Sequence, residues 1–385
     1  MLILSGFSES RSTYCKTSSY LRLYGWILTP QVSKIVLYSK NEKISEISID
    51  INREDIWLAY NKIGRPLCGW SYESEIVNLD IDNLFLYFYD ENEKLFLSQK
   101  IDVVFNQEKE NHLASLIILD AQKISSNPVS IYNKLKDDLQ NRSYIYKLNE
   151  ENYFEWFQRV NYTANYPQYC QEFGGETILH TKALQHYLSI LLLDIQNSDT
   201  YIDIASSHSV CPDIIRKFHT TNIYRQDIQY KIGVHGELIG SNAENIPLLD
   251  NSIDKMALHC SFEHFENNAD INFIKEAHRI LKPNGKFVIT PLYLSETAHI
   301  LTSPSIWENK YGLQGFPKFT QNHPIIIKED IKQRQEKIFS PESLRKEILE
   351  PYDTFFKFEI YYIQEVKNKM LQNYPKFTLV GTKKV

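Results

Sequence analysis

The chain has 385 residues, 43% of them hydrophobic, and a net charge of −6 without any basic block, so we expect neither a nucleic-acid partner nor an anionic membrane surface. Its five scattered cysteines lack a C-x-x-C pair, which argues against a disulfide framework and a metal site. No N-terminal signal pattern or membrane-length apolar run is visible, so we expect a soluble, cytoplasmic protein with two domains.

Short runs typical of β-strands fill the chain from about residue 20 to residue 105. Ile47, Ile49 and Ile51, for example, alternate with polar residues as one buried face of a sheet would. The runs predict a β-sandwich domain over residues 1–108. Three tryptophans accompany these runs: Trp26, Trp57 and Trp70. They suit a platform for sugar rings, but burial in the core is the commoner state for tryptophan at strand positions.

The middle of the chain loses this alternation and gains helical spacing. Leu113, Leu116 and Ile117 are an example, and residues 109–173 are therefore predicted to form a helical connector. After Gly174 and Gly175, a long amphipathic helix precedes a strand at residues 201–205. From there an α/β pattern continues, which predicts a third region over residues 174–385.

The stretch from Gly240 to Pro291 contains a turn, a strand, a helix and a second strand in succession. The first strand is apolar enough to be covered on both faces, as in parallel sheets. In the helix, apolar residues recur at spacings of three and four: Ile271, Ile274, Ala277 and Leu281. Pro283 to Gly285 end this pattern. The order predicts a doubly wound, mostly parallel sheet with helices between its strands.

Five features of this stretch resemble, in order, the second half of class I S-adenosylmethionine-dependent methyltransferases, and most closely the type 11 subgroup. They are Asn242, Ile246-Pro247, Asp250 to Asp254, Glu263-His264 and Leu281 to Gly285. The resemblance implies a Rossmann-like methyltransferase fold with S-adenosylmethionine as cofactor. We expect methyl transfer to a hydroxyl of a small molecule or glycan.

The N-terminal strands resemble β-sandwich modules that accompany bacterial glycosyltransferases, through Gly25-Trp26 and Gly69-Trp70. This second resemblance implies partner enzymes in a glycan or secondary-metabolite pathway.

The cofactor crevice is expected at the carboxyl ends of the parallel strands. Asp203 ends the first strand and is expected to orient the methionine amino group, directly or through water; a helix cap is the alternative. Ala205, Ser207 and Ser209 stand where methyltransferases carry glycines. They would let the backbone approach a ligand if they keep negative φ.

Two further cofactor contacts are implied by the resemblance. Asp227 follows the second strand and is assigned to the ribose hydroxyls, with a solvated turn residue as the alternative. Asn242 and Ala243 are assigned to the adenine edge, since an amide both donates and accepts, although an ordinary turn asparagine would look the same.

His259 and Glu263 are the candidates for a catalytic base, which methyl transfer needs only when the acceptor must lose a proton. His264 is better explained as structural. The inserted segment after Pro291 is expected to form a lid or acceptor pocket with Tyr293, His299, Trp307, Tyr311 and His323.

Other enzyme classes lack their motifs. No Gly-x-Ser-x-Gly elbow, phosphate loop or Gly-x-Gly-x-x-Gly turn is present. Because the first turn has no glycine, the alternative to the enzyme is a catalytically silent methyltransferase-like domain in a glycan-binding or scaffold protein.

Overall fold

The computed structural model describes residues 11–12, 20–27, 31–52, 67–75, 83–100, 104–105, 127–138, 142–173, 175–307, 316–320, 323–328, 331–364, 366–371 and 376–385. The chain forms two compact units, Met1–Leu116 and Ile117–Val385. The sequence pattern places boundaries after residues 108 and 173 instead. Among the residues described, no helix is both long and apolar enough to cross a membrane.

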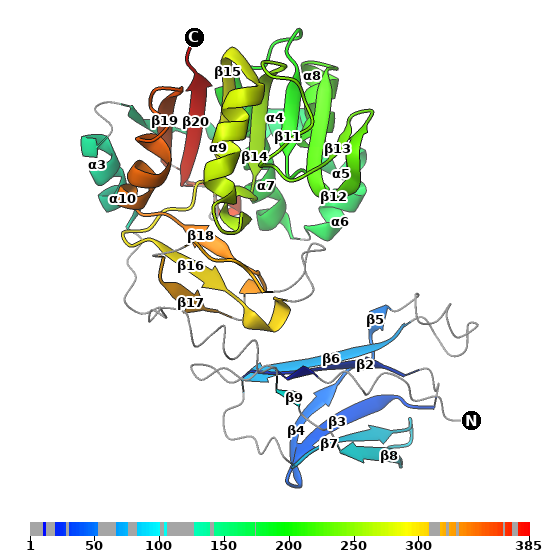
Figure 1. Ribbon diagram of the computed structural model, residues 1–385. Coiled ribbons are helices and arrows are strands. Elements are labelled where there is room, and N and C mark those ends of the chain that lie inside the picture. Colours follow the sequence, from blue (N-terminus) through cyan, green and yellow to red (C-terminus); the bar gives the residue numbers. More distant parts are fainter. Residues whose placement is uncertain are drawn as a thin grey trace. The chain divides into compact units, whose positions relative to one another are not determined.

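The N-terminal unit consists of small, mostly antiparallel sheets (Figure 1). The first contains β2 (Tyr20–Trp26), β6 (Leu67–Glu75) and β5 (Ile51–Asn52). The second contains β4 (Glu42–Ile47), β3 (Lys34–Ser39), β7 (Leu84–Tyr89) and β8 (Leu95–Lys100), and a short parallel pair joins β1 (Arg11–Ser12) to β9 (Val104–Phe105).

One hydrophobic cluster joins the two larger sheets of this unit. Trp70 of β6 is 2% exposed and belongs to the same cluster as Ile35 and Phe88 of the second sheet. Trp70 is therefore a core residue and not part of an exposed sugar platform. Trp57 lies outside the described residues, and so does the side chain of Trp26.

The C-terminal unit is built on an eight-stranded sheet. In spatial order its strands are β10 (Ser143–Lys147), β19 (Phe356–Gln364), β20 (Phe377–Lys383), β15 (Leu281–Thr290), β14 (Ile253–His259), β11 (Tyr201–Ile204), β12 (Ile223–His235) and β13 (Leu238–Gly240). β20 runs antiparallel to both neighbours. The sheet is otherwise mostly parallel.

Of the neighbouring parallel strands β13, β12, β11, β14 and β15, the first in the chain is β11, which lies in their middle. β11 pairs in parallel with β12 on one side and with β14 on the other, so the strand order reverses at β11. All four residues of β11 are buried, as a strand covered on both faces requires. In sheets of this type the crevice for a ligand opens at the carboxyl ends of the strands beside such a reversal.

Helices cover both faces of the sheet (Figure 1). On one face lie α3 (Pro128–Asp138), α9 (Ala269–Ile280) and α10 (Pro341–Leu344), which continues as a π-helical turn, η7 (Arg345–Leu349). On the other lie α4 (Glu150–Val160), α5 (Tyr162–Asn165), α6 (Pro167–Glu172), α7 (Glu176–Leu193) and α8 (Cys211–Phe218). Two short 3-10 turns, η4 (Phe262–His264) and η8 (Lys369–Leu371), complete these layers.

The region predicted as a connector belongs largely to the C-terminal unit. β10 extends the sheet by pairing with β19, and Tyr153, Trp156 and Tyr162 are buried in the same cluster as α7. Leu113, Leu116 and Ile117, whose spacing led to the prediction of a helical connector, lie outside the described residues. The boundaries of this region stay a prediction.

The inserted segment after Pro291 forms a small sheet of β17 (Ile325–Ile327), β16 (His299–Thr302) and β18 (Glu336–Ile338), with a 3-10 turn, η5 (Pro304–Ile306). Lys337 of β18 anchors it to the main layers. Its Nζ lies 2.6 Å from a carboxylate oxygen of Asp270 in α9 and 2.9 Å from one of Glu347 in η7. Lys337 and Asp270 are fully buried, so removing the lysine would leave the Asp270 carboxylate buried without its ion-pair partner.

We predict that a fragment of residues 117–385 unfolds cooperatively, whereas a fragment of residues 174–385 does not. The shorter fragment lacks β10 and uncovers α7, because it loses Tyr153, Trp156 and Tyr162. At about 1.5–3 kcal/mol for each large buried side chain, this loss is comparable with the whole stability of a domain. Thermal unfolding of both fragments, followed by circular dichroism, tests the boundary; equal melting of the two would contradict it.

Candidate functional site

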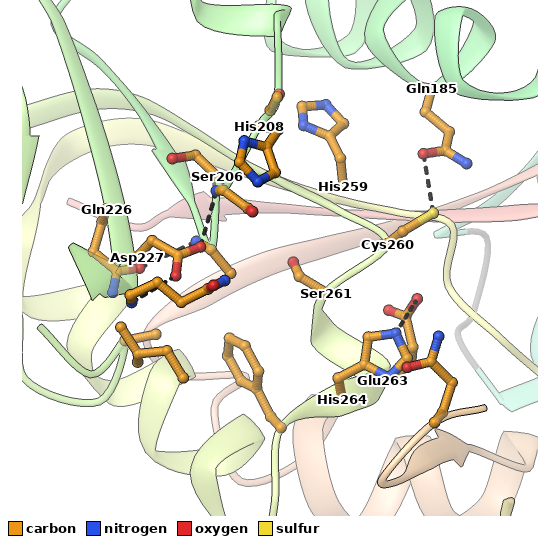
Figure 2. A pocket seen from close by; sticks show the side chains of 18 of the residues that line it. Gln185, Ser206, His208, Gln226, Asp227, His259, Cys260, Ser261, Glu263 and His264 are labelled. Atoms are coloured by element: carbon orange, nitrogen blue, oxygen red, sulfur yellow. Dashed lines mark hydrogen bonds and ion pairs between the residues drawn. The ribbon is translucent and has the colours of Figure 1, made fainter. Parts of the chain in front are cut away.

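A cavity of about 750 Å³ opens at the carboxyl ends of β11, β12 and β14. One wall is the turn after β11 together with the ends of β12 and β13. The opposite wall is residues 259–266 with part of the inserted segment, and α6 and α7 contribute residues between them. Figure 2 shows Ser206, Gln226 and Asp227 on the first wall and Cys260, Glu263 and His264 on the second.

The turn after β11 takes a left-handed path at two non-glycine residues. The φ angles are 50° at Ala205 and 37° at Ser207, where negative φ was expected. The backbone thus follows the course that glycine usually permits, at a cost of about 1–2 kcal/mol per residue. Hydrogen bonds hold it there: the Ala205 N–H donates to Gln226 Oε1 at 3.1 Å and the Ser207 N–H to Asp227 Oδ2 at 2.9 Å.

Asp227 lies at the cavity, as predicted, but its carboxylate already has partners. Besides the bond from Ser207, its second oxygen accepts the Gln229 N–H at 2.9 Å, and the residue is only 4% exposed. In this arrangement Asp227 fixes the backbone on both sides of the first wall. A ligand hydroxyl would have to share an oxygen that also accepts a backbone bond.

The chain after Asp227 bulges around β13. Asp227 and Ile232 are both paired with Gly240, so residues 228–231 are looped out between them. A Cβ on Gly240 would lie 2.0 Å from the Lys231 carbonyl oxygen, which explains the glycine. The bulge brings Ile228, which is 46% exposed, to the cavity as an apolar surface.

Asn242 and Ala243 follow β13 and also line the cavity. The Asn242 Oδ1 accepts the Glu244 N–H at 3.2 Å, which closes a local turn and leaves its amide N–H groups outside that bond. Ala243 is buried. The pair thus places a polar amide beside an apolar wall, a combination suited to a flat heterocycle.

A hydrogen-bonded chain of three buried side chains lies behind the turn. His259 Nδ1 is 3.1 Å from Asp203 Oδ1, and His259 Nε2 is 2.8 Å from the Ser189 Oγ of α7. Because both ring nitrogens are engaged, His259 has no free nitrogen for an acceptor. The other oxygen of Asp203, Oδ2, is buried and has no hydrogen-bond partner in the described part of the protein.

Glu263 is a buried carboxyl group on the opposite wall. Burial raises its pKa to about 7, and its Oε2 has no hydrogen-bond partner among the described residues. Its Oε1 lies 3.7 Å from His264 Nε2, while His264 Nδ1 is 2.7 Å from the Gln335 carbonyl oxygen. At neutral pH this carboxyl group can therefore either give or take a proton.

The inserted segment adds residues near Glu263 that the sequence did not indicate. Glu336 of β18 lines the cavity, and its pKa is raised by burial and by the charge of Glu263. Gln226 and Ser189 were likewise missed, since neither belongs to a motif.

Of the aromatic residues and histidines expected to form the pocket, Tyr293 lines the cavity; His299, Trp307 and His323 are buried elsewhere, and Tyr311 lies outside the described residues.

Among the described residues, no group of three or more His, Cys, Asp and Glu side chains is placed to hold a metal ion. The Sγ–H of Cys260 donates instead to Gln185 Oε1 at 3.2 Å (Figure 2).

We predict that Ala205→Gly stabilises the protein by about 0.5–1 kcal/mol, because relief of the left-handed strain outweighs the entropy that glycine adds to the unfolded chain. The matched control is Ala257→Gly in β14, a buried alanine without positive φ, which should destabilise by about 1 kcal/mol. Urea denaturation measures both. A loss of stability in the Ala205 variant similar to the control would show that the turn is not strained.

We also predict that Glu263→Gln changes how stability depends on pH. The folded pKa of Glu263 is about 7, against 4.5 for an ordinary glutamate, so folding of the parent is disfavoured as pH rises through 7 and Glu263 must ionise in a buried site. The free energy of unfolding of the parent, relative to that of the Glu263→Gln variant, should fall by about 2–3 kcal/mol between pH 5 and pH 8. Parallel curves for the two proteins would contradict this.

Comparison with known proteins agrees with this geometry. Residues 220–289 match the Methyltransf_11 family, described as "Methyltransferase domain". The chain is similar to the ubiquinone/menaquinone biosynthesis C-methyltransferase UbiE of Rickettsia typhi, with 38% identity over 68 residues, which are 17% of this chain and 26% of that protein. The chain therefore spans about a quarter of the length of that relative.

Two solved structures illustrate the more distant likenesses. The 1,6-didemethyltoxoflavin-N1-methyltransferase of Burkholderia thailandensis is 11% identical and has a TM-score of 0.35, over 60% of this chain and 89% of that one. The PH0226 protein of Pyrococcus horikoshii is 13% identical with a TM-score of 0.33, over 58% of this chain and 98% of that one.

The family match covers the strand, turn and helix that form much of the cavity wall. It confirms the prediction of a methyltransferase domain within the C-terminal unit, for which S-adenosylmethionine is the cofactor.

Proposed function

We propose that the protein transfers the methyl group of S-adenosylmethionine to a hydroxyl group of a small molecule or glycan. One observation carries the proposal: a buried carboxyl group with a free oxygen, Glu263, shares its cavity with a left-handed turn at the end of the first parallel strand. The turn is suited to a cofactor, and the carboxyl group to deprotonating an acceptor.

The first wall fits the cofactor in several respects. The left-handed turn brings the backbone of Ala205 and Ser207 to the cavity surface. Ile228 and Ala243 supply apolar surface, and Asn242 an amide, for a flat base. Behind the turn, the free oxygen of Asp203 is an acceptor for an ammonium group, directly or through a water molecule.

The role of Asp227 is proposed in a modified form. Its oxygens accept backbone N–H groups from both sides, so its main contribution would be to hold the turn and the β12 bulge in place. Each oxygen has more than one lone pair, so a ribose hydroxyl could still donate to it. Loss of Asp227 should therefore weaken both cofactor binding and stability.

Glu263 is the proposed general base. S-adenosylmethionine, when bound, supplies a methyl group on a positively charged sulfur. Glu263 accepts the proton of the acceptor hydroxyl while the acceptor oxygen forms its bond to the methyl carbon and the carbon–sulfur bond breaks. His259, the other candidate from the sequence, is better suited to positioning, because both of its nitrogens are already bonded.

The role of the N-terminal unit and the identity of the partners are proposed from the resemblance alone. The β-sandwich could present a glycan or contact another enzyme of a glycan or secondary-metabolite pathway. The alternative, a catalytically silent domain in a scaffold protein, rested on the absence of glycine from the first turn. The left-handed backbone of that turn favours the enzyme.

Calorimetric titration and a turnover assay test the proposal together. We expect the parent to bind S-adenosylmethionine and S-adenosylhomocysteine with micromolar affinity. The Glu263→Gln variant should bind both compounds as tightly as the parent does. With a hydroxyl acceptor found by screening the parent, it should form S-adenosylhomocysteine at least about 100-fold more slowly. Glu172→Gln, a change at an exposed glutamate on the cavity rim, is the control and should keep full activity.

Absence of binding to either compound would favour the silent domain over the enzyme. Full activity in the Glu263→Gln variant would instead leave the methyltransferase in place and remove Glu263 as its base.

A further inference from the structure

We infer that Ser189 and His259 are positioning residues that hold Asp203 ready for the ammonium group of the cofactor, an inference that rests on the proposed function. The three residues come from three different elements: Ser189 from α7, Asp203 from β11 and His259 from β14. They are 0%, 1% and, for the histidine side chain, 7% exposed.

The hydrogen-bond chemistry of this chain assigns a direction to each bond. A carboxylate can only accept, so Nδ1 of His259 carries the proton that Asp203 Oδ1 accepts at 3.1 Å. In the neutral ring, Nε2 is then an acceptor, and the Ser189 hydroxyl donates to it at 2.8 Å. Asp203 thereby selects the tautomer, and the Ser189 hydroxyl, which can donate or accept, fixes the orientation of the ring.

Without Ser189 the ring loses one of its two hydrogen bonds, so its orientation is held less firmly, and with it the hydrogen bond to Asp203. A dipole that is held in place in advance contributes more to binding than one that must be ordered when the ligand arrives.

The second carboxylate oxygen of Asp203, Oδ2, is the atom that would accept a hydrogen bond from the ligand or from water. Oδ2 is buried without a hydrogen-bond partner among the described residues, which is costly unless a ligand or water completes it. Arg225 lies nearby, but its guanidinium group bonds instead to Asp213, at 2.6 Å, and to the Ser209 carbonyl oxygen, at 2.9 Å. Asp203 does not itself line the cavity, so a cationic ligand group at the adjacent turn would reach this oxygen through a water molecule that completes its hydrogen bonding.

The same geometry excludes a nucleophilic role for Ser189. The order Asp203, His259 and Ser189 resembles a hydrolase triad, but the serine lies inside the layer between α7 and the sheet and does not line the cavity. A substrate carbonyl could not reach its hydroxyl. Of the three residues only His259 lines the cavity, and its two nitrogens point to Ser189 and Asp203.

The test compares two ligands that differ in the amino-acid part alone. S-adenosylhomocysteine carries the ammonium group, whereas methylthioadenosine has the same adenosine and sulfur without it. Titration calorimetry should show that Ser189→Ala weakens S-adenosylhomocysteine binding about fivefold while methylthioadenosine binding stays within about twofold of the parent. His259→Ala should weaken the first ligand at least as much. His259→Asn, whose amide N–H can replace that of Nδ1, should restore most of the affinity.

The matched control is Ser295→Ala, which removes another buried serine hydroxyl, bonded to the Thr297 carbonyl oxygen, and should change neither affinity. Melting temperatures without ligand verify that each variant is folded. Equal losses for both ligands, or no loss for either, would overturn the positioning role while leaving the proposed function intact. A parent protein that binds neither ligand would remove the proposed function and this inference with it.

Discussion

The cavity depends on the way in which β11 and β12 are tied together where their pairing stops. Gln226 and Asp227, at that point of β12, accept the backbone N–H groups of Ala205 and Ser207 after β11, and these bonds hold two non-glycine residues in a left-handed conformation. A glycine-rich turn reaches such a course without strain. Here the strain is offset by charge-assisted hydrogen bonding to a buried carboxylate. One residue, Asp227, thereby shapes both the turn and the bulge that completes the first wall.

The two walls use buried carboxyl groups in opposite ways. Asp203 has one oxygen fixed by His259 and one free oxygen beneath the turn, an arrangement suited to a ligand that brings positive charge. Glu263 has His264 3.7 Å away, and burial raises its pKa to about 7. A carboxyl group with a fixed partner can orient a ligand, and one with a pKa near 7 can transfer a proton. In the proposed function, cofactor recognition and proton transfer therefore lie on different sides of one cavity.

The inserted segment connects the opposite wall of the cavity, residues 259–266, to the packed layers of the domain. β18 contributes Glu336 to the cavity, and the next residue, Lys337, is buried against Asp270 of α9 and Glu347 of η7. Asp270 lies in the first turn of α9, where its carboxylate accepts a hydrogen bond from this lysine. A buried ion pair of this kind specifies where β18 lies more than it adds net stability. The ion pair thus fixes the position of Glu336 relative to Glu263, whose charge helps to raise the pKa of Glu336.

Local patterns in the sequence were enough to predict those helices and strands whose apolar residues mark the buried face. The helix with Ile271, Ile274 and Ala277 and the strands on either side of it follow from apolar periodicity and turn residues. The ordered motifs from Asn242 to Gly285 predicted a methyltransferase domain. The tertiary structure alone decided that β10 joins the sheet, that Ala205 and Ser207 have positive φ, and that Ser189 meets His259 across 70 residues of chain. Periodicity reports how a segment is buried but not which segment buries it. The partners of the polar groups in the site are set by the order of the strands, which no local pattern contains.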